Sequence, residues 1–172
     1  MPCPVCGGHA LRPLRPAQGH VPALACCLHC RLVRLEAPLP LAGCASPGAE
    51  AAQPPGHVRW DGQAVVVSGP DTAPFSQLSC HDVIGRAPDP ALLVARLAAL
   101  LGRGGLIHIT EPDFHHWRRP ANLDGWAGFA PGSRSHWFGT HTLTRLLADH
   151  GLWLVRRRRR LAPVIDLVAR KG

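Results

Sequence analysis

Short apolar runs alternate with polar stretches along the second half of the chain and predict a set of β-strands. Residues 63–68 (QAVVVS) are rich in β-branched side chains and are bounded by glycine on both sides, which favours a short strand. A second strand is expected over 78–84. Residues 106–110 (LIHIT) are typical of a strand buried within a parallel sheet. Two further strands, over 152–158 and 164–169, are expected to form a hairpin.

Two helices are predicted between these strands. Asp89 has a side chain suited to an N-cap, Pro90 suits the first position of a helix, and the apolar pattern ALLVARLAALL follows. The second helix begins at Thr140 or Thr142, includes LTRLLADH and ends before Gly151, which suits the left-handed position after a helix. Strands that alternate with helices in this way indicate an α/β sheet.

Paired cysteines near the N-terminus predict a metal site. Cys3 and Cys6 form one C-x-x-C pair, and Cys27 and Cys30 form a second. Four thiolates in two such pairs give the closed tetrahedral site that zinc prefers, and a module this small depends on the metal for its folding. Cys26 is an alternative to Cys27, but it would change the second pair to C-x-x-x-C. We therefore expect a structural zinc ion, with no open position for catalysis.

The composition divides the chain into three parts. Residues 1–35 contain the cysteine pairs and are interpreted as a zinc ribbon. Residues 36–57 are rich in alanine, proline and glycine and lack periodicity, which predicts a linker. Residues 58–172 carry the strands and helices of the α/β domain.

The charge of the chain suggests an acidic partner, but its composition weakens that inference. The formal net charge is +8 and the pI is near 10. Eighteen of the nineteen basic residues are arginine, which in a chain rich in Ala, Pro, Gly and Leu indicates a compositional bias. The run Arg156–Arg160 is interpreted as a solvated or partner-facing ribbon. Nucleic acid is therefore not an expected partner.

The sequence also bears on location. No apolar run reaches the roughly 18 residues that a membrane span needs, so no membrane association is expected. The start, Met-Pro-Cys-Pro, lacks the charged and apolar segments of a secretory signal. A cytoplasmic location is expected, where cysteines are metal ligands or free thiols rather than disulfides.

Three sequence blocks resemble class I S-adenosylmethionine-dependent methyltransferases of the small-molecule type. Residues 81–90 (HDVIGRAPDP) are similar to the family's D-V-L-E-H-V-P-D-P, which ends the fourth strand. Residues 100–112 (LLGRGGLIHITEP) resemble its fifth strand and the entry to it, and residues 136–151 resemble its H-x-F-T-x-x-T-L helix and exit. A preceding CPVCG … C-x-x-C-x-L-V zinc ribbon also occurs in this family. The resemblance implies a Rossmann-like sheet, truncated at its first half.

The same resemblance implies cofactor-binding residues. Within VVSGPDTAPF, Asp71 matches the residue of the family's GDAxxLPF segment that contacts adenine, and His81 and Asp82 stand at the end of the fourth strand. The segment can also be interpreted as a degraded glycine turn, although the first interpretation places its Pro-Phe pair better. The sequence departs from the family twice: it has no glycine-rich turn before Asp82, and Gly85-Arg86 replaces Glu-His.

The missing first half has a structural consequence. Without a first strand, the strand over 78–84 is expected to have an unpaired edge, which invites a partner strand. We therefore expect a homo-oligomer, or a partner protein that completes the sheet, rather than a stable monomer.

Two functions follow from these patterns. The first is impaired or partner-dependent methyl transfer from S-adenosylmethionine to a small molecule. The second is a non-catalytic zinc-ribbon binding or scaffold protein. In the family the region 113–138 covers the acceptor site, where a histidine could serve as general base. No catalytic residue is assigned.

Overall fold

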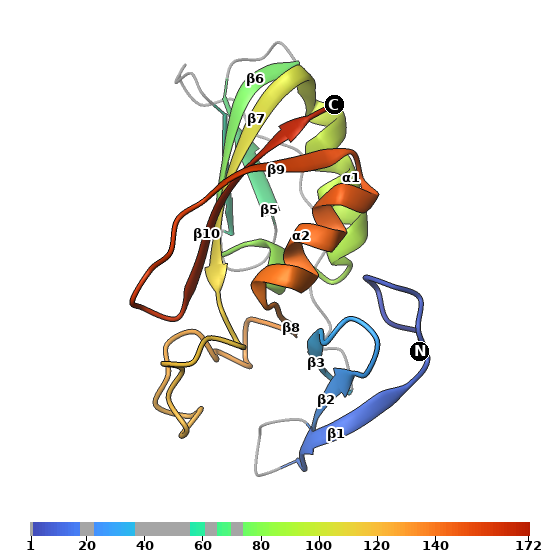
Figure 1. Ribbon diagram of the computed structural model, residues 1–172, viewed down its shortest axis with the longest axis vertical. Helices are drawn as coiled ribbons and strands as arrows, with labels where there is room; N and C mark the ends of the chain where they lie inside the picture. The colour runs from blue at the N-terminus through green and yellow to red at the C-terminus, as the bar shows by residue number, and fades with distance from the viewer. Residues whose placement is uncertain (1, 18–22, 37–55, 61–64, 70–73) are drawn as a thin grey trace.

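The computed structural model describes residues 2–17, 23–36, 56–60, 65–69 and 74–172. Within these ranges the chain forms a four-stranded sheet, a six-stranded sheet and two α-helices. Figure 1 shows the six-stranded sheet and the helices together, with the smaller sheet beyond one end of them. The predicted α/β class with an N-terminal cysteine cluster is confirmed.

The six-stranded sheet has the order β5-β4-β6-β7-β10-β9. The neighbours β4, β6 and β7 are parallel, whereas β5, β10 and β9 each run antiparallel to the strand beside them. The strands are β4 (Gly56–Trp60), β5 (Val65–Ser68), β6 (Phe75–His81), β7 (Leu101–Pro112), β9 (Leu152–Arg157) and β10 (Val164–Lys171). The predicted C-terminal hairpin is therefore present as β9 and β10.

Helix α1 begins, and helix α2 ends, as the local signals predict. Helix α1 (Pro90–Leu100) follows Asp89, whose carboxylate accepts a 3.0 Å hydrogen bond from the amide of Leu92. Helix α2 (Thr140–Asp149) is followed by Gly151 at a φ of +74°, the left-handed conformation that glycine adopts without strain.

The prediction that β6 has an unpaired edge is wrong. Strand β4 pairs with it in parallel, with Val58 opposite Cys80, so β6 has neighbours on both sides. The strand also ends earlier than predicted, at His81, because Asp82 adopts a positive φ of 57° and Ile84–Arg86 form a short 3-10 helix, η1. Within the described residues the outer strands are β5 and β9, and the oligomeric state stays a prediction.

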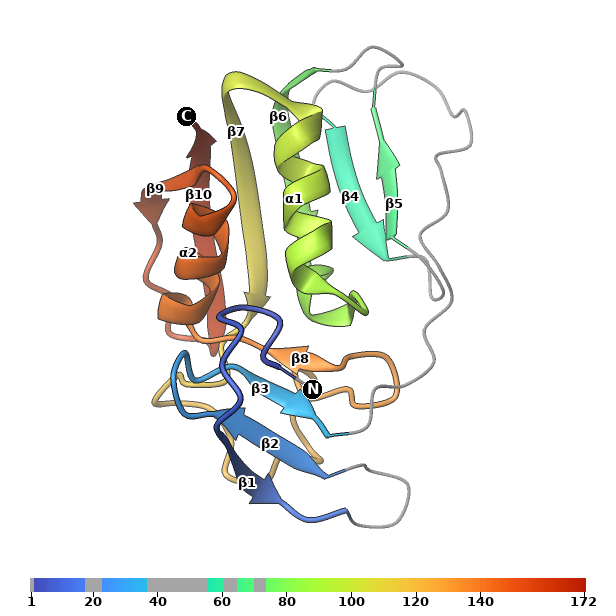
Figure 2. The same ribbon diagram turned by 90° about the vertical axis from the view of Figure 1, so that its right-hand side faces the viewer.

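Both helices cover the same face of the six-stranded sheet, as Figures 1 and 2 show from two directions. Cys80 of β6 and Ile107 and Ile109 of β7 are buried in the main core with the helices. The alternate residues on the other face, such as Ser79 and His108, are only half-buried. The prediction that β7 is buried on both faces thus holds for one face only, and the structure has two layers there.

The smaller sheet joins the N-terminal region to the loop before α2. Its strands are β1 (Leu11–Arg15), β2 (Leu24–Cys27), β3 (Val33–Leu35) and β8 (His136–Trp137), in that order. Trp137 lies opposite Val33 and is buried in a second apolar cluster, which also includes Phe114 and Phe129 of the loop. The aromatic loop, residues 113–139 between β7 and α2, therefore packs on the N-terminal sheet.

The predicted linker 36–57 lies outside the described residues except at its ends, and Gly56 and His57 already belong to β4. The domain boundaries at 35 and 57 remain predictions. Neither helix of the described ranges is long and apolar enough to cross a membrane.

Candidate functional site

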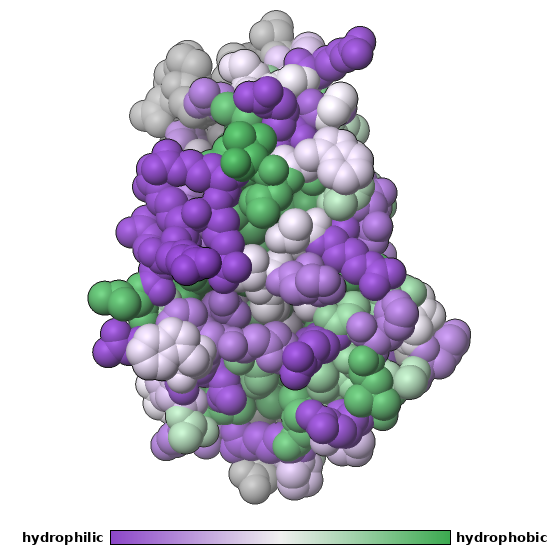
Figure 3. Space-filling view, in the orientation of Figure 1, coloured by the Kyte–Doolittle hydropathy of each residue, from purple (hydrophilic) through white to green (hydrophobic). Residues whose placement is uncertain are grey.

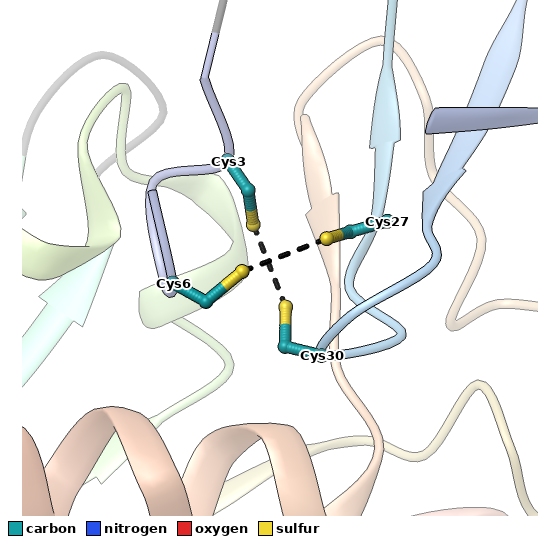
Figure 4. Close-up of side chains that lie close together, drawn as sticks. All are labelled: Cys3, Cys6, Cys27 and Cys30. Carbon is teal, nitrogen blue, oxygen red and sulfur yellow. Dashed lines mark hydrogen bonds between the residues drawn. The ribbon is translucent and has the colours of Figure 1, made fainter. Parts of the chain in front are cut away.

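Four thiols meet where the N-terminal sheet faces α2 (Figure 4). The Sγ atoms of Cys3, Cys6, Cys27 and Cys30 all lie within 4.8 Å of one another. Cys3 and Cys30 are 3.5 Å apart, and Cys6 and Cys27 are 3.6 Å apart. A tetrahedral zinc ion with Zn–S bonds of about 2.3 Å separates its sulfur ligands by about 3.8 Å. The cluster can therefore hold a metal ion with only slight movement.

The backbone forms the same turn at both cysteine pairs. The amide of Gly7 donates to the carbonyl oxygen of Cys3 over 2.8 Å, and the amide of Arg31 donates to that of Cys27 over 2.9 Å. Gly7 and Arg31 both have left-handed φ values, 67° and 64°. The repeated geometry aims both thiols of each pair at one point, as a metal knuckle requires.

Hydrogen bonds between the thiols shift their pKa values in opposite directions. The contact with Cys30 lowers the pKa of the Cys3 thiol to about 5, and the same contact raises the pKa of Cys30. Burial raises the pKa of Cys6. Cys26 lies outside the cluster, and its thiol contacts the carbonyl oxygen of Cys27 at 3.6 Å. The choice of Cys27 over Cys26 from sequence spacing agrees with this arrangement.

A second group of charged residues lies at the carboxyl end of β6. The carboxylate of Asp82 pairs with the guanidinium groups of Arg134 and Arg86. Arg134 is 1% exposed and also donates a 2.8 Å hydrogen bond to Glu111, which is equally buried. The other carboxylate oxygen of Glu111 accepts a 2.6 Å hydrogen bond from the amide of Ile84. Asp82 is thus part of an ion-pair network that is buried at Arg134 and Glu111, whereas its own side chain is 45% exposed.

The departure at Gly85-Arg86 is explained by this network. A Cβ atom at Gly85 would lie 1.9 Å from Nη1 of Arg134 and 2.5 Å from the carbonyl oxygen of His136. Glycine is therefore needed for the guanidinium of Arg134 to reach both carboxylates. Arg86 adds a second cation to Asp82 and donates a 2.6 Å hydrogen bond to the hydroxyl of Ser133.

His81 turns away from Asp82. Its Nδ1 is 2.8 Å from the hydroxyl oxygen of Thr110, and its ring lies edge-on to that of His108, with centroids 5.3 Å apart. Partial burial, and then the nearby His108, lower the pKa of His81. Of the residues that the resemblance assigns to the cofactor, His81 and Asp82 are adjacent in sequence but do not face one another, and Asp71 lies outside the described residues.

Two members of the network, Arg134 and Glu111, were not singled out from the sequence. Arg134 and Glu111 are 23 positions apart in the sequence, and Asp82 lies 29 positions before Glu111. No local spacing therefore reveals their contacts. The one sequence signal of a changed arrangement at the end of β6 was the replacement of the family's Glu-His by Gly85-Arg86.

The histidines of the aromatic loop make structural contacts. His115 bonds through Nε2 to the carbonyl oxygen of Arg31 at 2.8 Å, and His116 bonds to that of Arg160 at 3.2 Å. His136 is 7% exposed, and burial, followed by the charge of Arg34, lowers its pKa to about 4. At 7% exposure His136 has little access to a small-molecule acceptor, so its burial gives no support to a role as general base.

Several solved methyltransferase structures are similar to this chain. The Burkholderia thailandensis 1,6-didemethyltoxoflavin-N1-methyltransferase, with bound S-adenosylhomocysteine, is 20% identical; the match covers 58% of this chain and 45% of that protein, with a TM-score of 0.43. Human N-acetylserotonin methyltransferase, in complex with S-adenosylmethionine, is 16% identical, with coverage of 66% and 35% and a TM-score of 0.49. Magnesium protoporphyrin IX methyltransferase from Synechocystis, with bound S-adenosylhomocysteine, is 18% identical, with coverage of 59% and 47% and a TM-score of 0.43.

This chain spans less than half the length of each of these three proteins. Among curated proteins, none matches it. The family model described as a methyltransferase domain matches residues 7–156, from the N-terminal sheet to β9, and confirms the resemblance drawn from the motifs. Since that match covers most of its length, the chain belongs to the methyltransferase-domain family.

Proposed function

We propose that this chain is a methyltransferase-family protein with impaired methyl transfer, because its own residues do not form a complete site for S-adenosylmethionine. The observation that carries the proposal is the pairing of Asp82 with Arg134 and Arg86. Two guanidinium groups already engage the Asp82 carboxylate, so it has less capacity left to accept hydrogen bonds from a cofactor, although its side chain is 45% exposed. The charge pairing therefore weakens this position as a cofactor contact.

The connection after β4 supports the same conclusion. Strand β4 runs parallel to β6 and beside it, as a first strand would. Only residues 61–64 separate β4 from β5, which pairs with it antiparallel. Nucleotide-binding sheets place a glycine turn and a helix after this strand, with backbone close to the ligand. Four residues leave no room for that helix.

Calorimetry with S-adenosylhomocysteine tests the proposal. The full chain, purified with zinc and shown to melt cooperatively, is expected to give no saturable heat up to millimolar ligand. A methyltransferase known to bind the ligand serves as the positive control. A micromolar dissociation constant for the chain alone would contradict an incomplete site.

The thiol cluster is proposed to hold one structural zinc ion. Four sulfur ligands fill a tetrahedral site, so no position is left for a water molecule or substrate. This arrangement supports the second candidate function, a non-catalytic zinc-ribbon binding or scaffold protein. In that case zinc stabilises the N-terminal sheet and its contacts with the aromatic loop, and no reaction depends on it.

The proposal has a second form, in which methyl transfer depends on a partner chain. In this form of the proposal, a second chain supplies the cofactor contacts that Asp82 and the short β4–β5 connection do not. Strand β5 pairs only with β4 among the described residues and offers an outer edge. Light scattering after size exclusion checks self-association: a dimer supports a second copy as the partner, and a monomer excludes it.

A further inference from the structure

A groove of about 280 Å³ lies on the face of the six-stranded sheet that the helices leave open. Strands β6, β7 and β10 form its floor, and the residue after β9 forms one wall. The residues that matter here are Gln77, Ser79, Leu106, His108, Val168 and Arg158. Its volume is close to the lower limit of small-molecule sites. It lies over the middle of the strands, away from the carboxyl end of β6.

The groove combines an apolar floor with uncommitted polar groups. Leu106 and Val168 supply the apolar surface. The amide of Gln77, the hydroxyl of Ser79 and the guanidinium of Arg158 make no side-chain hydrogen bond or ion pair with any described residue. A sheet face built to receive helices is apolar throughout, so this face is better suited to a small polar ligand than to a packed helix.

Among the described residues, the groove carries a positive charge because the neighbouring carboxylate of Asp166 is already paired. Oδ1 of Asp166 lies 3.0 Å from Nε2 of His108, and Oδ2 accepts hydrogen bonds from Arg160 at 2.8 and 2.5 Å. Burial raises the pKa of Asp166, but the hydrogen bonds from His108 and Arg160 outweigh it and lower the pKa overall. Asp166 therefore stays ionised and paired, and the charge of Arg158 is left over.

The surroundings of the groove match this charge. Figure 3 shows hydrophilic side chains gathered on the side of the molecule where the connection between β9 and β10 lies. The arginine run 156–160 forms the end of β9 and the start of that connection. Only Arg158 of the run lines the groove, while the guanidinium of Arg160 is held by Asp166. The guanidinium of Arg158, the one arginine among the described lining residues, lies beside an apolar floor and favours a small anion over an extended polyanion.

We propose that this groove binds a phosphate monoester of a small organic group. The guanidinium of Arg158 pairs with the phosphate, because its planar fork matches two phosphate oxygens. Gln77 and Ser79 donate further hydrogen bonds to it. The organic group lies on Leu106 and Val168. This site is independent of S-adenosylmethionine binding and of the thiol cluster.

Titration with phenyl phosphate, followed by amide NMR shifts, tests the proposal on the full zinc-loaded chain. Phenol and inorganic phosphate serve as the two half-ligands. Phenyl phosphate is expected to bind at least about tenfold more tightly than either, with shifts confined to β6, β7 and β10, since it alone uses both surfaces. Equal affinity for phenyl phosphate and phosphate, or shifts spread over the arginine run, would overturn the proposal.

Two arginine variants give the matched comparison. Arg158→Ala is expected to weaken phenyl phosphate binding by about tenfold or more, the usual effect of a lost charged hydrogen bond. Arg159→Ala removes the same charge from the next exposed position, which does not line the groove. It is expected to change the affinity less than twofold, because exposed charges have weak effects. Equal losses of affinity in the two variants would show a diffuse electrostatic attraction of the ligand to the arginine run instead.

A single-stranded oligonucleotide tests the alternative ligand. If it binds more tightly than phenyl phosphate and depends equally on both arginines, this face binds nucleic acid and the small-ligand site is overturned.

Discussion

The hydroxyl of Thr142 donates a 2.5 Å hydrogen bond to the carbonyl oxygen of Cys30. Thr142 lies in the first turn of α2, and Cys30 is the last cysteine of the thiol cluster. Both residues are buried, and the main apolar core contains Cys3, Cys27 and Cys30 together with α1, α2 and the six-stranded sheet. The thiol cluster is therefore packed against the helices rather than separated from them.

Loss of the metal should destabilise the whole chain in one step. Cys30→Ser is expected to remove the bound zinc and to lower the free energy of unfolding by more than about 4 kcal/mol, as the loss of a metal site does. Zinc content and thermal unfolding, monitored by far-ultraviolet and tryptophan signals, measure this. Cys26→Ser is the control, because Cys26 lies outside the cluster. Two separate transitions, or one zinc retained by Cys30→Ser, would show that the coupling is absent.

Removal of Arg134 should leave Glu111 without its cation, whereas Asp82 keeps its pairing with Arg86. Arg134→Met is expected to cost about 3–5 kcal/mol of stability, since Glu111 is then buried and unpaired. The double variant with Glu111→Gln should recover a large part of the loss, because glutamine still accepts the hydrogen bond from Ile84. Urea unfolding of the two single variants and the double variant measures the coupling. Additive losses would mean that the two side chains do not interact.

Gly85 should tolerate no side chain. Gly85→Ala is expected to lower stability by about 1–3 kcal/mol, because the new methyl group meets Arg134 and the backbone oxygen of His136. Gly132→Ala has open space around the added atom and is the matched control. The comparison uses the midpoints of denaturant unfolding. A similar small change in both variants would place the guanidinium of Arg134 elsewhere.

His136 should make the chain sensitive to mild acid. Its pKa falls from about 6.5 in the unfolded chain to about 4 in the folded one, so the unfolded state binds the proton first as the pH decreases. Stability from this residue is complete above pH 6.5 and is lost toward pH 4, by up to about 3 kcal/mol. His136→Asn keeps a partner for Ser135 and should flatten the pH dependence in this window. An unchanged slope in His136→Asn would assign the acid sensitivity to other groups.

The sequence predicted the features that depend on local chemistry. The spacing of the four cysteines, the Asp89-Pro90 start of α1 and the glycine after α2 each rest on conformations within a few residues, and the structure shows them. Strand β4 was missed because Gly56 and His57 follow a segment rich in proline and alanine, and its pairing with β6 is a contact between distant segments.

The contacts of the candidate site were predictable only in part. Strand β8 is two residues long and exists because Val33 and Arg34 pair with it, so no periodicity reveals it. The network of Asp82, Glu111 and Arg134 joins three segments in the same way. Gly85 indicated a departure from the family pattern at the end of β6, but not that the guanidinium of Arg134 lies beside it.

The four-residue connection between β4 and β5 also limits what mutation can restore. Exchanging side chains at Asp82, Gly85 or Arg86 changes the charge at the end of β6 but adds no backbone. Under the proposed function, a nucleoside cradle on this chain would need a new turn-and-helix segment between Trp60 and Val65. In evolutionary terms, an unaided enzyme would then arise through an insertion rather than through a series of codon changes.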